Sequence, residues 1–284
     1  MKSIFIDLNR QGKCRVLRRF LLSFLSAAFM IITVLRVQGY TAEKTGAELV
    51  IYAAGGIKPA LDEIIRAYKK RSSAVINTTY GSGGGVLTKI LLAKRGDIFI
   101  SPENRFMLSA LHNDVVCSDT LRTLACLLPA IGVKKGNPKD IRNLEGLARK
   151  DIKIAVCRKE STLLGPYAYE LFTKSKNREA IEANISVVAS DPNNLLNILC
   201  LGAVDAVITW HIYGMLPGSP IDIIDLKPEQ LPGICSMEAA VVKYSRSPEA
   251  ASAFLAFMAS KEAGAILKRF GYMTEQEAAD RLMK

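Results

Sequence analysis

Several residue patterns that carry chemistry in other proteins are missing from this sequence. Histidine occurs only twice in 284 residues, at His112 and His211, and no Cys-x-x-Cys pair occurs. Metal sites are usually built from such ligands at short spacing, so we expect no metal ion bound by the protein and no cofactor. No Gly-x-Ser-x-Gly frames a serine nucleophile, and no Gly-Lys-Ser/Thr closes a phosphate loop. These absences argue against a metalloenzyme, a serine hydrolase and a P-loop nucleotide-binding protein.

Long runs of basic residues are also absent after residue 39. The chain has 38 Lys/Arg and 27 Asp/Glu, a net charge of +11, but residues 1–39 hold seven of the basic and one of the acidic residues. The remaining 245 residues therefore carry about +5, without the basic runs interleaved with aromatics that a nucleic-acid surface needs. We expect no nucleic-acid partner, and a modest positive field that helps to collect a small anion.

The basic N-terminus belongs to a pattern typical of export. Basic residues within the first 19 positions precede an apolar run, Phe20–Leu35, and then Val37-Gln38-Gly39. This order predicts a signal peptide over residues 1–39 and a periplasmic or extracytoplasmic protein. The 16-residue run is long for a signal peptide and short for a membrane span, so an uncleaved anchor is the alternative. No cysteine follows closely, so a lipid has no attachment site.

Five cysteines follow residue 39, an odd number, so at least one is free or pairs with another molecule. Cys126, Cys157 and Cys200 lie in apolar runs and are expected in the core. A disulfide such as Cys117–Cys126 is compatible with export, but the spacing does not assign one.

Strands alternate with helices along the rest of the chain. The expected strands are 48–53, 74–79, 97–100, 152–157, 185–189, 206–210, 221–226 and 238–243, and a longer apolar run covers 124–133. The expected helices are 59–71, one starting at 86, 105–112, 167–174, 192–201, 248–260 and 261–270. This alternation predicts an α/β fold with parallel sheets, in which ligands bind at the carboxyl ends of the strands.

The most distinctive stretch is Tyr80–Ile90, which reads Tyr-Gly-Ser-Gly-Gly-Gly-Val-Leu-Thr-Lys-Ile between an expected strand and helix. The first N–H groups of a helix have no internal partner, and the helix dipole favours negative charge there. Glycine allows close approach of the backbone, and Ser82 adds a hydroxyl donor. We interpret the stretch as an anion-binding loop, with a flexible glycine-rich turn as the alternative. A hydroxyl that faces a cleft should add little to stability.

Three further loops have a similar place between strand and helix. They are residues 53–59, residues 160–166, and residues 190–194 together with the strand end at 209–211. Each is weak evidence alone, since every α/β protein has such turns. Together they could supply neutral hydrogen-bond donors to a single site.

Two blocks carry a resemblance to a known family. Gly81–Gly84 followed by Gly96–Ser101 resembles the hallmark pair of the periplasmic molybdate- and tungstate-binding proteins. Leu201–Trp210 is similar to a later block of that family, in which Gly-x-x-Asp-Ala precedes a strand ending in an aromatic residue. Lys134–Pro138 and Phe254–Gly271 match as well, so the resemblance covers nearly all of residues 47–272 in the same order.

The resemblance implies a two-lobed, type II periplasmic binding-protein fold with mostly parallel sheets and two hinge crossings. The crossings would lie near Leu124–Ile131 and Ile234–Val241. Residues 47–126 plus 236–284 would form the first lobe, and residues 127–235 the second. Such a protein captures a tetrahedral oxyanion, here molybdate or tungstate, and delivers it as a monomer to the membrane permease of an ABC importer.

Carried over to this sequence, the resemblance implies a site of neutral donors from both lobes. Its residues would be Gly55, Gly56, Ser82, Gly83, Leu164, Gly165, Asn193 and Trp210. Glycine replaces a serine that the family often has in the first loop, which leaves one anion oxygen to Lys58, water or backbone. Pro192 lacks an N–H that the family often uses, and Asn193 would substitute for it. Trp210 stands where many relatives have Tyr, and its alternative role is core packing.

Neutral donors are sufficient because the anion itself makes the hydrogen bonds charge-assisted. A site with few acceptors also disfavours protonated anions. Sulfate, phosphate or an organic anion are alternative ligands, since the sequence does not reveal pocket size. An exported enzyme on the same fold is a less favoured alternative, because neither histidine occurs in a triad pattern. A regulator's sensing domain would need a DNA-binding or signalling helix, for which the signal-like N-terminus leaves no room.

Overall fold

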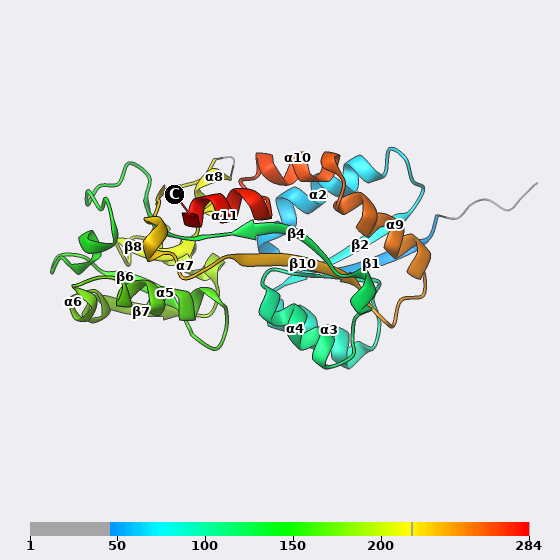
Figure 1. The fold of residues 1–284 in the computed structure, drawn as a ribbon, viewed down its shortest axis with the longest axis horizontal. Coiled ribbons are helices and arrows are strands. Elements are labelled where there is room, and N and C mark those ends of the chain that lie inside the picture. The colour runs from blue at the N-terminus through cyan, green and yellow to red at the C-terminus, as the bar shows by residue number, and fades with distance from the viewer. Residues whose placement is uncertain (1–45, 217, 284) are drawn as a thin grey trace, which may run out of the picture. The chain divides into compact units, whose positions relative to one another are not determined.

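The computed structural model describes residues 46–216 and 218–283, which form two five-stranded sheets with helices packed on them (Figure 1). The predicted signal peptide, residues 1–39, lies outside the described residues. Strands and helices alternate along the chain as the sequence predicts.

The first sheet has the strand order β2-β1-β3-β10-β4. Strand β1 (Glu48–Ala54) pairs in parallel with β2 (Val75–Gly81) on one side and β3 (Ile98–Ser101) on the other. The late strand β10 (Cys235–Val241) returns to this sheet and lies antiparallel to both β3 and β4 (Arg122–Leu127). Segments from both ends of the described chain therefore share one sheet.

The second sheet has the order β7-β6-β8-β5-β9. Here β6 (Ile154–Cys157) is parallel to β7 (Ile185–Ala189) and β8 (Ala206–Trp210), and β5 (Pro129–Lys134) is antiparallel to β8 and β9 (Ile221–Ile224). In each sheet one strand, β10 or β5, runs against its neighbours. The predicted α/β class with mostly parallel sheets is confirmed.

The chain passes from the first sheet to the second at Leu128, between β4 and β5. It returns between β9 and β10 through the short helix η4 (Pro228–Gln230). The apolar run over 124–133, where the resemblance implies a crossing, contains parts of two strands, β4 and β5. The run divides because β4 pairs in the first sheet and β5 in the second. At the division the Leu128 carbonyl accepts the backbone N–H of His211 (3.0 Å), and the Leu128 N–H donates to the imidazole Nδ1 (3.1 Å). The lobe boundaries near these crossings stay a prediction.

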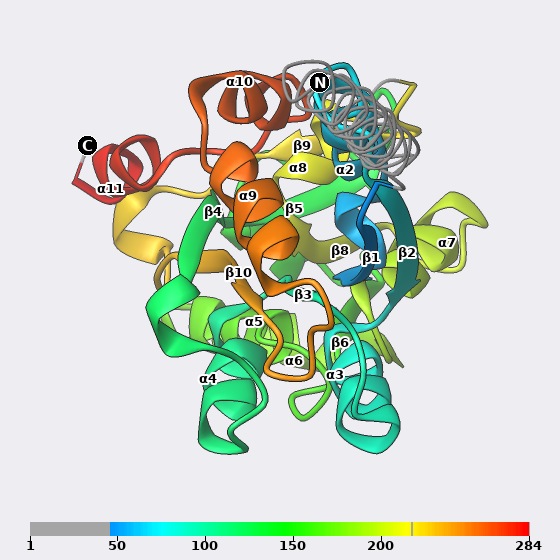
Figure 2. The same cartoon turned by 90° about the vertical axis from the view of Figure 1, so that its right-hand side faces the viewer.

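Helices cover both faces of the first sheet (Figures 1 and 2). On one side lie α2 (Lys58–Tyr68), α9 (Pro248–Met258) and α10 (Lys261–Arg269), and on the other lie α3 (Gly83–Ala93) and α4 (Asn104–His112). The buried residues of α2 fall at helical spacing, which is why this segment forms an amphipathic helix: Ala60, Leu61, Ile64, Ile65 and Tyr68.

Among the described residues, four α-helices belong to the part of the chain that forms the second sheet, called here the second half of the fold, and the part that forms the first sheet is the first half. They are α5 (Leu164–Thr173), α6 (Arg178–Ala183), α7 (Pro192–Cys200) and α8 (Ile212–Met215). The sequence reading missed α6, α8 and the C-terminal α11 (Glu275–Met283). The helices α6 and α8 are short, and α11 buries only Ala278. The apolar periodicity of these three segments is therefore weak.

All five thiols in the described part of the chain are free. Cys126 and Cys157 are buried, as predicted, and so is Cys235. The prediction for Cys200 is wrong, because this last residue of α7 is exposed. The ends of an amphipathic helix are more often exposed to solvent than its central turns. The apolar residues around Cys200 predict burial, but they do not show that Cys200 lies at the end of the helix.

No single helix within residues 46–216 and 218–283 is long and apolar enough to span a membrane. The helices α9 and α10 meet the length and composition only as a pair, and they are bent by 59° at the break between them.

Candidate functional site

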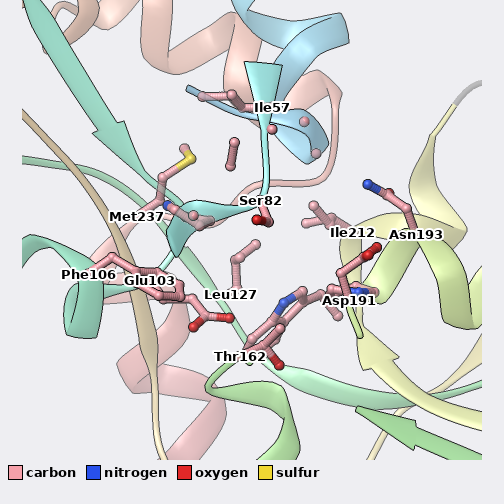
Figure 3. Close-up of a pocket in the computed structure, with 18 of the residues that line it drawn as sticks. Ile57, Ser82, Glu103, Phe106, Leu127, Thr162, Asp191, Asn193, Ile212 and Met237 are labelled. Carbon is pink, nitrogen blue, oxygen red and sulfur yellow. The ribbon is translucent and has the colours of Figure 1, made fainter. Parts of the chain in front are cut away.

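A cavity of about 380 Å³ lies between loops of the two sheets (Figure 3). Its walls come from the loops after β1, β2 and β3 in the first sheet, and after β6, β7 and β8 in the second. These loops leave the carboxyl ends of parallel strands, where α/β proteins bind ligands. Each of the four loops selected from the sequence contributes at least one lining residue.

Ser82 lies at the start of α3, where its backbone is extended and its side chain caps the helix. The Gly85 N–H donates to the Ser82 Oγ (3.2 Å), so the hydroxyl already accepts one bond. Its own hydrogen stays available for a ligand, as do the N–H groups of Gly83 and Gly84 in the first helical turn. The expectation that Ser82 adds little to stability is therefore wrong, since an N-cap side chain stabilises its helix.

Gly83 lines the cavity, but the reason for a glycine at this position is the close packing of Phe106 and Pro102 against it. A Cβ there would lie 2.5 Å from the ring of Phe106 and 2.8 Å from Pro102. Pro102 lies between β3 and α4, and Phe106 lies in the first turn of α4, so a glycine is needed for the start of α4 to pack against the start of α3. The backbone of Gly83 still faces the cavity together with Ser82.

The first loop, after β1, brings Gly55 and Gly56 to the cavity. A Cβ on Gly55 would lie 3.7 Å from the Asn193 side-chain nitrogen, so these two predicted residues face each other from opposite sheets. The phenol of Tyr272 donates to the Gly56 carbonyl (3.3 Å). Lys58 does not line the cavity, because its ammonium pairs with Asp62 (2.8 Å).

The third loop, residues 160–166 after β6, lines the cavity with residues other than those predicted from the sequence. Ser161 and Thr162 line it, whereas Leu164 and Gly165 are fully buried behind them. The Gly165 N–H donates to the Thr162 Oγ1 (3.3 Å), and a Cβ on Gly165 would lie 2.4 Å from the Arg158 carbonyl oxygen. Gly165 therefore allows the loop to fold on itself, and the structure does not bring Leu164 and Gly165 to the cavity.

The fourth loop begins α7. Asp191 caps this helix by accepting the Asn194 N–H (3.0 Å), and Pro192 occupies its first turn, where a missing N–H is tolerated. Asn193 lines the cavity and accepts a hydrogen bond from the Tyr213 phenol (3.3 Å). Trp210, at the end of β8, is only 3% exposed, lines the cavity and packs edge-on against Tyr167. Trp210 therefore packs in the core and also reaches the wall of the cavity, and its role as a donor to the ligand stays a prediction.

Glu103 is not among the site residues predicted from the sequence, yet it is the only acid from the first half that lines the cavity among the described residues. Its side chain is 3% exposed, and its Oε2 accepts the Leu163 N–H from the other half at 2.6 Å. Burial raises the pKa of Glu103 to about 7, against the lowering effects of the Leu163 hydrogen bond and the Arg105 charge. Its place directly after the predicted strand that ends near Ser101 is the signal that could have identified it.

Apolar side chains complete the cavity, among them Phe106, Leu127 and Met237 from the first half and Ile212 from the second. Within the described residues the lining contains no Lys, Arg or His side chain. Nor do those residues place three His, Cys, Asp or Glu side chains together as a metal site. The polar groups that face the cavity are therefore hydroxyls, amides, backbone N–H groups and two carboxyls.

His211 lies at the crossing between the sheets and not in the cavity lining. In its neutral form Nδ1 accepts the Leu128 N–H (3.1 Å) and Nε2 donates to the Gly271 carbonyl (2.9 Å). Both ring nitrogens are thus used by the backbone, so His211 cannot act as a base for Ser82 in this arrangement.

The family of bacterial extracellular solute-binding proteins matches residues 49–273. The chain belongs to this family. A Bacillus subtilis protein provisionally named an ABC transporter substrate-binding lipoprotein is 24% identical over 240 residues, 84% of this chain and 91% of that protein. An aconitate isomerase of a Pseudomonas species is 24% identical over 239 residues, 78% of this chain and 86% of that enzyme.

Among solved structures, this solute-binding protein is similar to the substrate-binding domain of a provisionally assigned molybdenum ABC transporter from Clostridium difficile. The identity is 25%, the TM-score is 0.67, and the match covers 80% of this chain and 99% of that domain. The two-lobed periplasmic binding-protein fold expected from the sequence is confirmed by this likeness.

Proposed function

We propose that this solute-binding protein captures a tetrahedral oxyanion, with molybdate or tungstate as the first candidates, outside the cytoplasmic membrane. It would deliver the anion to the permease of an ABC importer, the system named for the Bacillus subtilis relative. The observation that carries the proposal is the Ser82 loop. Its hydroxyl and the free N–H groups of α3 face a cavity enclosed by both halves of the fold.

Hydrogen-bond geometry supports an anionic ligand. Helices begin at this cavity after β2 and β7, and each helix start presents the positive end of its dipole. At α3 the N–H groups of Gly83 and Gly84 have no helical partner. At α7 only that of Asn193 has none, because Pro192 lacks an N–H and Asp191 accepts the N–H of Asn194. Thr162 and Asn193 add side-chain donors from the second half. Hydrogen bonds to an ionised acceptor are about twice as strong as neutral ones, so such donors can hold an oxyanion without a cationic side chain.

Calorimetry tests this proposal. The purified protein should be titrated separately with molybdate, tungstate, sulfate and phosphate. We expect micromolar or tighter binding of molybdate or tungstate, and at least tenfold weaker binding of phosphate, which carries a proton near neutral pH. Tighter binding of phosphate or sulfate than of molybdate and tungstate would contradict the assignment.

A small organic anion is the second candidate, favoured by the size and lining of the cavity. About 380 Å³ falls within the range of pockets that bind small organic molecules, roughly 300–1,000 Å³, and much of its wall is apolar. The isomerase relative is named for a tricarboxylate substrate. Aconitate should therefore be included in the titrations, and its isomerisation should be followed by chromatography. Turnover that depends on the protein would establish an enzyme on this fold.

A further inference from the structure

Glu103 is unexpected in a cavity built for an anion. It is nearly fully buried, lines the same space as Ser82 and comes from the loop after β3 (Figure 3). A buried carboxylate repels an incoming dianion strongly, because a low dielectric strengthens the interaction between charges. The site therefore either excludes doubly charged ligands or changes the charge of Glu103 when they bind.

The surroundings hold the Glu103 carboxyl in place. Ser101 donates its hydroxyl to the Glu103 carbonyl (2.5 Å), and the Leu163 N–H donates to Oε2 (2.6 Å). Because Oε2 is used by Leu163, a proton on the carboxyl would sit on Oε1. A carboxylic acid with its proton on Oε1 is a hydrogen-bond donor, and it matches the hydroxyls and N–H groups around it.

Within the part of the chain that the structure describes, few positive charges lie near Glu103 that could offset the repulsion between an ionised Glu103 carboxylate and a bound anion. Arg105, in the first turn of α4, directs its guanidinium toward the Glu160 carbonyl oxygen (3.1 Å) and does not line the cavity. Asp191 lines the cavity from the second half. The other titratable groups close enough to influence Glu103 are neutral thiols and phenols: Cys157, Tyr167, Tyr213 and Cys235.

We propose that Glu103 takes up one proton from solvent when a doubly charged oxyanion binds, and then donates it as a hydrogen bond to the anion. The proton returns to solvent when the anion leaves, so no other reactant is needed. This inference rests on the proposed oxyanion function. It makes Glu103 a specificity-determining residue, since its charge state decides whether the site accepts a dianion.

The pH at which this coupling operates follows from the environment of the carboxyl. Burial raises the pKa of Glu103 to about 7 in the free protein, so below pH 6 the group is already protonated and binding takes up almost no proton. At pH 8.5 the free group is ionised, and close to one proton should be taken up per anion. The dissociation constant should then rise about tenfold for each pH unit above 7.

Calorimetry in pairs of buffers with different ionisation enthalpies tests the proposal. Molybdate and tungstate should be titrated at pH 6, 7, 8 and 8.5, and the buffer dependence of the enthalpy gives the number of protons taken up. Glu103→Gln keeps the shape and the acceptor for Leu163 but does not titrate. We expect this variant to bind with the same dissociation constant at pH 7 and pH 8.5, and at least tenfold more tightly than the parent at pH 8.5.

Glu238→Gln is the matched control. Glu238 is a half-buried acid on β10 whose pKa is also raised by burial, but it does not line the cavity. The control should take up protons as the parent does. Binding by the parent without proton uptake, or uptake that persists in Glu103→Gln, would overturn the coupling alone. If neither anion binds the parent even at pH 6, the oxyanion function fails and the coupling with it.

Discussion

Ser82 caps α3, and the proposed function gives the same hydroxyl a second role as a donor to the ligand. Its oxygen accepts the Gly85 N–H, which closes the first turn of the helix, and its hydrogen is free to point to a ligand in the cavity. Stability and binding are therefore coupled at this residue. A substitution of Ser82 must therefore be compared with the same substitution of a serine that caps a helix but does not line the cavity.

Ser82→Ala is expected to weaken oxyanion binding about ten- to hundredfold, because one charge-assisted donor is lost. It should also lower the free energy of unfolding by roughly 0.5–2 kcal/mol, the usual effect of losing an N-cap side chain. Ser260→Ala is the control, because Ser260 caps α10 by accepting the Ala263 N–H (3.3 Å) away from the cavity. It should lower stability similarly and leave the dissociation constant unchanged. Equal losses of affinity in both variants would contradict a ligand role for Ser82.

Gly83→Val tests whether this glycine serves packing. The new side chain would overlap Phe106 and Pro102, so we expect the free energy of unfolding to fall by about 1–3 kcal/mol. Gly84→Ala should have a smaller effect, since its Cβ would lie 3.3 Å from the Phe106 ring. Urea unfolding of the two variants and the parent measures the difference. A Gly83→Val protein as stable as the parent would show that the α3–α4 contact adapts freely.

At the scale of elements, His211 joins three segments that are far apart in the chain. It follows β8, its Nδ1 accepts the N–H of Leu128 between β4 and β5, and its Nε2 donates to Gly271 after α10. The ring must be neutral for Nδ1 to accept a hydrogen bond. Protonation would remove this acceptor at the first crossing between the sheets.

This arrangement predicts a loss of stability in mild acid. Burial lowers the pKa of His211 below its ordinary 6.5, so the unfolded chain binds more protons than the folded one below that value. The stability that neutral His211 confers is thus present above pH 6.5 and is lost as the pH falls through its folded pKa. His211→Gln should be less stable than the parent at pH 7.5, and the difference should shrink toward pH 5 by up to about 1.4 kcal/mol per pH unit.

Urea unfolding of the parent and His211→Gln between pH 5 and 8 checks this prediction. Comparing the two proteins at each pH cancels the effect of Glu103, which has the opposite sign. The raised pKa of Glu103 makes its contribution to stability fall as the pH rises from 4.5 to about 7. A difference between parent and variant that does not change with pH would refute the role assigned to His211.

At the scale of the whole fold, hydrogen bonds already link the two halves around the cavity. The Leu163 N–H donates to Glu103, and the Arg105 guanidinium donates to the Glu160 carbonyl. These bonds span the cavity edge, while the covalent connections are the crossings at Leu128 and between β9 and β10. Such an arrangement permits hinge closure, in which a few residues change conformation and the two halves move as bodies.

Saturating molybdate is therefore expected to lower the radius of gyration of the protein, measured by small-angle scattering with and without the anion. Closure should follow the anion because it adds hydrogen bonds from both halves to one ligand. Ser82→Ala at the same molybdate concentration should show a smaller change, since fewer molecules are occupied. Identical profiles with and without a saturating anion would count against closure.

Local patterns in the sequence were enough to predict the α/β class and the positions of most strands and helices. They also selected loops that do meet at one cavity. The reason is that strand-to-helix turns are encoded by neighbouring residues, as in the Tyr80–Ile90 stretch, and that parallel strands place such turns at the same edge of a sheet. The resemblance to oxyanion-binding proteins placed Gly55 and Asn193 in loops that the structure brings face to face.

Which residue of each loop reaches the cavity was decided only by the tertiary structure. Thr162 lines it while Leu164 and Gly165 are buried, because the third loop folds against its own Arg158 carbonyl. Glu103 enters the cavity because Leu163, sixty positions later, holds its carboxyl there. Both outcomes depend on contacts between segments distant in the chain. Local periodicity contains no information about them, since it reports only which face of an element is buried and not what it is buried against.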